Sequence, residues 1–446
     1  MLCRVTCLRW TMDAVSLNLS GKIWFPHLKE ASWVAVGQAA VAVGGLLAIK
    51  ASTNVLGAAE FGRLSAALAI AGLGQVCFFG PVSQVALRFF SRAKDRHTLD
   101  DYWLSLLKLY LIGVLAVALC WLASIFANFN HTLLVPSVLI AIYALVSGLQ
   151  MILLAVINAA RLRKWVAGLQ VADAFLKPVF VVGIALLMDR SASDVISAYI
   201  ITPLIILSVL FGVITSLWSR NQHLALPSDG EGGHFGLVKQ MTSFTLLFVL
   251  FGVLGAIGSH GERLLLINFV SWEDVGTYAL MTQLALAPSV MLTSVINQFY
   301  LPLIYQSDSS GSAKFGRSYR YYVMFSVIGV FAVALFVATF GRWIIPLFSS
   351  TEFLGNENLL WFLALSAGIF NLGQQLVLPG MLENRLRVYV PSKLLHSLGL
   401  ICLAFLLTPM WGITGMAVAS VISAAVYTLS VIGANAYLAR SAVMPT

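Results

Sequence analysis

Two stretches of the sequence, LGAAEFGRLSAAL at residues 56–68 and VSWEDVGTYALMT at residues 270–282, decide the fold class. They match at an offset of 214 residues, which aligns Glu60 with Asp274 and Gly62 with Gly276. Each stretch joins one apolar segment to the next. The match therefore predicts that the chain consists of two internal repeats.

The composition on both sides of these stretches is that of a membrane protein. Of the 446 residues, 59% are hydrophobic and only 10% are charged, whereas a soluble domain carries about 25% charged residues. The apolar runs are continuous and long enough for membrane-spanning helices, while a transmembrane β-barrel would show short alternating segments. A soluble globule is excluded, and no connection is long enough for a separate catalytic domain.

Apolar runs between charged or Gly/Pro-containing connections predict twelve helices in two sets of six. The first set covers residues 31–52, 61–89, 102–126, 133–159, 165–188 and 195–219; the second covers 237–258, 275–305, 321–340, 358–381, 388–408 and 413–439. An even number of spans gives both halves the same orientation, as in parallel repeats related by an axis along the membrane normal. We expect an all-α integral membrane protein with two six-helix bundles in a V around a central cavity.

The domain organisation follows from these spans. We expect an N-terminal bundle at 31–219, a linker at 220–236, a C-terminal bundle at 237–439 and a tail at 440–446. The linker, RNQHLALPSDGEGGHFG, is rich in turn-forming residues. Residues 1–30 form a leader without the apolar core and cleavage site of a signal peptide, and Met12 is an alternative start.

The positions of the cations predict the orientation of the chain. If the N-terminus is cytoplasmic, twenty of the 27 Lys and Arg residues lie in inner segments. The outer connections then hold only Arg63, Arg190, Arg263 and Arg342. Lys and Arg stay on the cytoplasmic side of membrane helices. Both termini are therefore expected on the cytoplasmic side of the membrane, and the formal net charge of +9 reflects topology rather than nucleic-acid binding.

The sequence contains none of the short motifs of enzymes or metal sites. It lacks a Gly-x-Ser-x-Gly element, a His-Glu-x-x-His element, a Walker loop and a Cys/His cluster with metal spacing. Three of the five cysteines, Cys77, Cys120 and Cys402, lie far apart in apolar segments and give no disulfide framework. We expect no catalytic residue, no metal and no cofactor.

The residues that point to function are ionisable groups at membrane depth, where a charge must be hidden in a bundle or a wet cavity. Asp173 is the only acid well inside a predicted span, and Lys177 follows four residues later on the same helix face. Asp173 is a candidate for coupling to an ion gradient and Lys177 for binding an anion. The alternative is a mutually neutralised pair that only packs.

Two further cations are candidate anion ligands. Lys50, near the outer end of the first span, either lines a central cleft or extends its ammonium to the membrane surface. Arg263 follows Glu262 just beyond the seventh predicted span, where a surface ion pair is the alternative. Lys108 is expected to extend to the surface.

Amides and glycines recur within the spans. A shared aqueous cavity would supply the hydrogen bonds that buried amides need. The amides are Gln38, Gln75, Gln84, Asn158, Gln170, Gln283, Asn297, Gln298, Asn371, Gln374 and Gln375. Gly252, Gly255, Gly258 and Gly261 indicate either close packing or a gating hinge at the end of the seventh span.

Residues 29–73, KEASWVAVGQAAVAVGGLLAIKASTNVLGAAEFGRLSAALAIAGL, resemble the start of the polysaccharide transporters of the multidrug, oligosaccharidyl-lipid and polysaccharide flippase superfamily. ERLLLINFVSWEDVGTYAL at 262–280 and WGITGMAVASVIS at 411–423 are similar to later stretches of that family. The leader before Lys29 departs from the family pattern.

The resemblance implies a flippase with two bundles that move against each other. Its substrate would be a polyprenyl pyrophosphate carrying an oligosaccharide unit for O-antigen or exopolysaccharide, with a polysaccharide polymerase and chain-length machinery as possible partners in the bilayer. Lys50, Lys177 and Arg263 are the candidates for the anionic head group and Asp173 for ion coupling. These four come from depth and charge, because the family offers no strict site motif.

Two alternatives remain at this point. A multidrug or cation antiporter of the same superfamily would need cavity acids, and Asp173 stands beside a lysine. A membrane-embedded polysaccharide polymerase or glycosyltransferase would need sizeable outer loops, which the sequence lacks.

Overall fold

The computed structural model of the chain describes residues 24–95, 98–126, 135–222, 233–308, 313–383 and 385–441. Within these ranges the protein is helical and has no β-strand. The first helix begins at Trp24. The expected leader therefore lies outside the described residues as far as Ile23, as does the alternative start Met12.

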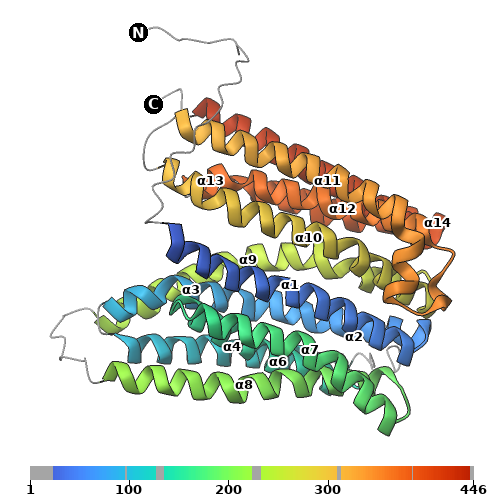
Figure 1. Cartoon of the computed structure of the whole chain (residues 1–446), viewed down its shortest axis with the longest axis horizontal. Helices are drawn as coiled ribbons and strands as arrows, with labels where there is room; N and C mark the ends of the chain where they lie inside the picture. The colour runs from blue at the N-terminus through green and yellow to red at the C-terminus, as the bar shows by residue number, and fades with distance from the viewer. Residues whose placement is uncertain are drawn as a thin grey trace.

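The helices form two lobes, one from each half of the chain (Figure 1). The N-terminal lobe contains α1 (Trp24–Val55), α2 (Ala58–Gly74), the π-helix η1 (Gln75–Phe79), α3 (Gly80–Asp95), α4 (Leu99–Phe126), α6 (Ser137–Ala159), α7 (Arg163–Leu187) and α8 (Ala192–Gln222). The C-terminal half contains α9 (Gly233–Leu266), α10 (Trp272–Asp308), α11 (Ala313–Phe348), η2 (Thr351–Phe353), α12 (Glu357–Leu376), α13 (Leu378–Leu382), η3 (Leu386–Tyr389) and α14 (Val390–Ser441).

The helix α14 is two antiparallel passes joined at Gly412. Its 52 residues would span about 78 Å if straight, far more than the roughly 30 Å of a bilayer core. Gly412 has a non-helical backbone with φ of +56°, which glycine adopts without a steric penalty. A side chain on Gly415 would collide with the Leu407 carbonyl eight residues earlier, so the chain reverses here.

Ten described segments are long and apolar enough to cross a membrane. One of them, Leu386–Arg440, contains both passes of α14. The 34-residue helix α9 is not among the ten. With α14 counted as two passes and α9 as one, the arrangement matches the twelve helices expected from the sequence.

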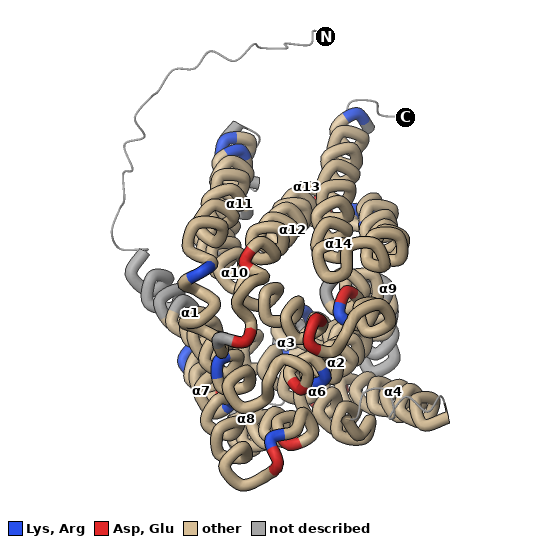
Figure 2. The backbone as a smooth tube through the Cα atoms, turned by 90° about the vertical axis from the view of Figure 1, so that its right-hand side faces the viewer, with Lys and Arg blue, Asp and Glu red and all other residues tan. Residues whose placement is uncertain are grey.

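The outer surface of the lobes is apolar, as a lipid-facing surface must be. On α4, exposed leucines follow the helical period at Leu104, Leu107, Leu111, Leu115 and Leu119. Lys, Arg, Asp and Glu are sparse along the helices in Figure 2. The hydrophobic effect does not hold such helices together in a bilayer, so close packing and interhelical hydrogen bonds must do so.

The two lobes meet where α2 crosses α10, through the two glycines that the repeat aligns. A Cβ on Gly62 would lie 2.9 Å from the backbone nitrogen of Gly276, and a Cβ on Gly276 would lie 3.0 Å from that of Gly62. Gly62 also packs on the carbonyl of Trp272, and Gly276 on that of Ala58. Residues 58 and 272 are themselves 214 apart, so the contact is self-complementary, as at a two-fold axis.

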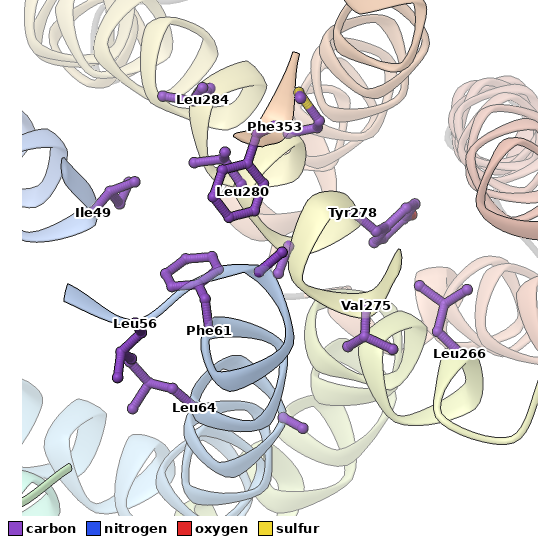
Figure 3. Packing of buried hydrophobic residues seen from close by; sticks show 14 of the residues in the cluster. Ile49, Leu56, Phe61, Leu64, Leu266, Val275, Tyr278, Leu280, Leu284 and Phe353 are labelled. Atoms are coloured by element: carbon purple, nitrogen blue, oxygen red, sulfur yellow. The ribbon is translucent and has the colours of Figure 1, made fainter. Parts of the chain in front are cut away.

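The buried core continues this contact toward η2. Figure 3 shows Phe61 of α2 facing Phe353, with Leu280 of α10 beside them. The two phenyl rings meet edge to face at 6.1 Å between centroids. Phe61, Leu280 and Phe353 are at most 3% exposed, so residues from both halves of the chain share one core.

The connections place the described ends on one side. The start of α1 and the end of α14 lie at the same end of the bundle in Figure 1, which we call the proximal end. The α1–α2, α7–α8, α9–α10 and α11–α12 connections lie at the other, which we call the distal end. The positive-inside pattern predicts that the distal end faces outward.

We expect Gly62→Ala to lower the Tm of the purified protein, because the new methyl group meets the α10 backbone and forces the lobes apart. Gly212→Ala on α8 is the control, since a Cβ there meets nothing within 4 Å and alanine stabilises a helix by about 0.5–1 kcal/mol over glycine. Thermal unfolding in detergent measures both. Equal effects of the two substitutions would contradict the close crossing.

Candidate functional site: the cleft between the lobes

The repeat creates two counterpart seams between the lobes, and they differ. In one seam, α9 packs along the N-terminal lobe. Phe244 packs against Phe89 with 5.9 Å between ring centroids and lies under the Arg88 guanidinium at 4.4 Å. Further along, a Cβ on Gly252 would lie 2.7 Å from the Val76 carbonyl. The seam is closely packed at these positions. Beside Val253 and Ile257 of α9, a second cavity of about 430 Å³ extends between α2, η1, α4 and α6.

In the counterpart seam, a cavity of about 500 Å³ lies between α1 and α10. It is lined over residues 38–49 of α1 and 283–295 of α10. Gln38, Gln283 and Ser294 are its polar residues, and the remaining lining is apolar or glycine. Such a cleft can receive an apolar chain along most of its wall and a polar group at the two amides.

Lys50 lies at the distal apex of this cleft, one residue beyond the lining residue Ile49. Its Nζ donates a hydrogen bond of 2.8 Å to the carbonyl of Leu347. That carbonyl is in the last turn of α11, where helix carbonyls have no partner within the helix and cations are favoured. An N-terminal-lobe cation therefore caps a C-terminal-lobe helix.

Further contacts close the distal end beside Lys50. Arg63 of α2 lies over the ring of Trp272 of α10, with 5.9 Å from the guanidinium carbon to the ring centroid. The same arginine pairs with Glu60, whose other carboxylate oxygen accepts a 2.9 Å hydrogen bond from the backbone N–H of Ala192 at the start of α8. Together with the Phe61 and Phe353 rings, these contacts join the two lobes distally.

Asp173 and Lys177 form an ion pair inside the N-terminal lobe. Lys177 Nζ lies 2.6 Å from Asp173 Oδ2, and the side chains are 25% and 21% exposed. The other carboxylate oxygen accepts a 3.2 Å hydrogen bond from Gln150 Nε2 of α6. Tyr143 and Tyr199 pack edge to face nearby, within electrostatic range of Asp173.

The pair faces the interior of the bundle and not the lipid. Near the pair, the exposed large side chains of α7 are Phe175, Val179, Val182 and Leu186, which lie on one helical face, while Trp165 and Leu187 are exposed at the helix ends. Asp173 and Lys177 project about 160° away from that face at 100° per residue. The pair is thus hidden as the cost of a charge in hydrocarbon requires.

Arg263 lies within a helix and not in a loop as the sequence indicated. The expected end of the seventh span at Gly258 was wrong, because α9 continues to Leu266 and places Arg263 in its last turn. Glu262 accepts hydrogen bonds of 2.6 Å from Tyr278 of α10 and from Ser420 of α14. This acid therefore holds three helices of the C-terminal lobe together.

The three candidate cations have different surroundings. Lys50 lies at the apex between the lobes, Lys177 within the N-terminal lobe and Arg263 at the end of α9. The amides are dispersed as well, so the expectation of one shared aqueous cavity for them was wrong. Gln38 and Gln283 line the cleft, while Asn371 and Gln375 line a small cavity in the C-terminal lobe. The side chain of Gln298 lies outside the described residues.

Sequence reasoning missed Gln150 and the role of Glu262. An amide within a long apolar run was the available signal for Gln150. Two of the four spaced glycines of α9, Gly252 and Gly258, are close contact points within a continuous helix. Gly252 packs on η1, and a Cβ on Gly258 would lie 2.7 Å from Nε2 of His396.

A family model described as "Polysaccharide biosynthesis protein" matches residues 27–308 of the chain. The chain belongs to this polysaccharide biosynthesis protein family. A search of the curated proteins gives no match.

Solved structures similar to this polysaccharide biosynthesis protein are membrane transporters. A multidrug resistance MATE family transporter of the MOP superfamily, in an inward-facing conformation, aligns at 13% identity and a TM-score of 0.64 over 94% of this chain and 96% of that one. The lipid II flippase MurJ, in an inward closed conformation, aligns at 12% identity and 0.62 over 91% and 87%. A MOP superfamily transporter from Pyrococcus furiosus aligns at 13% identity and 0.60 over 92% and 95%. The fold is the two-repeat fold of MOP superfamily transporters.

The double variant Asp173→Asn/Lys177→Met distinguishes an ion pair that only stabilises the fold from one that takes part in transport. We expect Lys177→Met alone to lower the Tm, because it leaves the Asp173 carboxylate unpaired at depth. The loss should stay below the 3–5 kcal/mol typical of a fully buried pair, since both side chains are partly exposed.

The neutral double variant should regain the wild-type Tm, measured by thermal unfolding. If the pair only packs, surface polysaccharide in cells returns with it. If Asp173 takes part in coupling, the Tm recovers and the polysaccharide does not.

Proposed function

We propose that this protein flips a polyprenyl-pyrophosphate-linked oligosaccharide, an O-antigen or exopolysaccharide precursor, across the bacterial cytoplasmic membrane by alternating access. The observation that carries the proposal is the cavity of about 500 Å³ between α1 of one lobe and α10 of the other, which has an amide from each helix in its lining. An amphiphilic substrate needs a polar head inside the protein and a tail left in lipid. The cleft between α1 and α10 can hold the polar head, while the apolar tail passes between these two helices into the lipid.

The head group is the anionic part of such a substrate, and Lys50 is the residue we propose to bind it at the apex of the cleft. Hydrogen bonds from an ammonium to phosphate oxygens are stronger than those to a neutral carbonyl. A pyrophosphate at the apex therefore competes with the Leu347 carbonyl for Lys50. Substrate binding would then weaken one of the contacts that close the distal end.

Lys177 and Arg263 are the other proposed anion ligands, and Asp173 is the proposed coupling residue. Since Lys177 now pairs with Asp173, protonation of the acid or binding of a cation to it would release the ammonium. This supports a mechanism in which an ion gradient, acting through Asp173, controls whether the Lys177 ammonium is free to bind an anion.

The proposed orientation places both termini in the cytoplasm and the distal end outward. The excess of Lys and Arg at the proximal connections supports it. Release of substrate to the outer leaflet would bring it to a polysaccharide polymerase and its chain-length machinery.

A multidrug or cation antiporter is the second candidate, because one of the similar folds is a multidrug resistance transporter. Such an antiporter binds its cargo through cavity acids. The cavity between α1 and α10 is lined by neutral side chains, and Asp173 is engaged by Lys177 and Gln150. These features favour the flippase.

The test uses proteoliposomes containing the full chain and a fluorescent polyprenyl-pyrophosphate oligosaccharide. A flippase carries the glycolipid from the inner to the outer leaflet of the vesicle, where membrane-impermeant periodate oxidises its glycan. In protein-free vesicles, periodate should oxidise only the glycolipid that is already in the outer leaflet. Transport of a fluorescent drug cation without any movement of the glycolipid would reject the proposal in favour of the antiporter.

We expect Lys50→Met to slow glycolipid movement at least several-fold in this assay, because the apex loses its cation. Lys108→Met is the matched control, since Lys108 is an exposed residue of α4. Wild-type rates in both variants would remove Lys50 from the site.

We expect a reducible cross-link between Phe61→Cys and Phe353→Cys, in a chain whose native cysteines are replaced, to stop flipping. The two rings lie 6.1 Å apart, so a short bifunctional thiol reagent can join these positions and hold the distal end closed. Reduction should restore activity. Unchanged transport in the cross-linked protein would show that the distal contact does not need to open.

A further inference from the structure

A small cavity lies inside the C-terminal lobe, away from the cleft, where α10, α11 and α12 meet. Its volume is about 10 Å³. Five polar side chains converge on it in spite of the apolar setting: Ser289, Thr293, Ser326, Asn371 and Gln375. None of the functions proposed above uses this group.

One atom in this cavity lacks a hydrogen-bond partner. Gln375 is 7% exposed, and its Oε1 is buried without a donor. A buried acceptor left in this way destabilises a protein by about 1–3 kcal/mol, and the bilayer offers it no water from outside. The cavity therefore needs a donor at this position.

Two of the three lining hydroxyls, those of Ser289 and Ser326, already donate their hydrogens within their own helices. Ser326 Oγ donates to the Tyr322 carbonyl at 2.7 Å, and Ser289 Oγ donates to the Ala285 carbonyl at 3.4 Å. Both oxygens keep lone pairs that can accept. The site thus presents acceptors that a single molecule with two O–H donors would satisfy.

The repeat explains why a gap exists here. The offset of 214 places Ser289 where the N-terminal lobe has Gln75. There, Gln75 Nε2 donates a 2.5 Å hydrogen bond to Ser147 Oγ and joins the π-helix η1 to α6. Serine is too short to reach across in the same way, so the C-terminal lobe has a cavity where its counterpart has a side chain.

We propose that one water molecule occupies this cavity and bridges Gln375 to the hydroxyls of α10 and α11. The volume is about that of one water-sized sphere, the lower limit for a hydrated cavity, and the site offers the two to four polar partners such a water needs. A metal cation is disfavoured, since every lining side chain is neutral and a buried charge needs a compensating one. The inference does not depend on the proposed function.

Radiolytic hydroxyl-radical labelling of the full chain detects such a water directly, because radicals formed from it modify the nearest side chains. We expect labelling of Ile296, which lines the cavity and is 8% exposed. Leu400, at 0% exposure, gives the background for a buried aliphatic side chain. Ile296 labelling at the Leu400 level in the wild-type protein would overturn the proposal.

Gln375→Leu, with Gln374→Leu as the neighbouring control, supplies the second measurement. With a bound water, Gln375→Leu loses hydrogen bonds, so Ile296 labelling falls to background and the Tm drops by about 2 °C or more relative to the control. If the cavity is dry, Gln375→Leu should instead raise the Tm relative to the control, because leucine then removes an unsatisfied acceptor. The third outcome is that NaCl, but not KCl or choline chloride, raises the wild-type Tm and that Gln375→Leu abolishes this rise. That result would show that an ion, and not a water molecule, occupies the cavity. If Gln375→Leu does not fold, the wild-type labelling still decides.

Discussion

The structure depends on one backbone contact, the crossing of α2 and α10 at Gly62 and Gly276. Without side chains at these positions, the two helices come close enough for each to pack on a carbonyl of the other. Close approach of this kind is how helices associate where the hydrophobic effect is absent. The contact joins equivalent points of the two repeats.

What surrounds this contact determines where a substrate can lie. Distally, Lys50, Phe61 and Arg63 of the N-terminal lobe reach Leu347, Phe353 and Trp272 of the C-terminal half. On one flank α9 packs on α3 and η1 through Phe244 and Gly252, and on the other α1 and α10 leave a cavity. The two counterpart seams therefore differ in what packs across them, and the amides Gln38 and Gln283 lie in the cavity between α1 and α10.

Much of the architecture was predictable from the sequence because membrane helices leave a strong signal. The repeat at Gly62 and Gly276, the twelve apolar segments and the pairing of Asp173 with Lys177 at i, i+4 all follow from local pattern and length, and the structure agrees with them. The family resemblance is confirmed by the match over residues 27–308. The end of α9 was misplaced at Gly258, where the lack of a side chain instead allows a close contact with His396 of α14. The candidate functional site was harder to predict from the sequence. The partner of Lys50 is a backbone carbonyl 297 residues away, and no sequence pattern encodes such a partner.

The most direct test of the account is to measure two distances between the lobes, one at each end, by double electron–electron resonance between pairs of spin labels. Asp189→Cys with Leu354→Cys reports the distal end, and Lys164→Cys with Arg317→Cys reports the proximal end. The account predicts that a polyprenyl-pyrophosphate oligosaccharide lengthens the distal distance and shortens the proximal one together. Distances that stay fixed at both ends while the glycolipid crosses the membrane would contradict it.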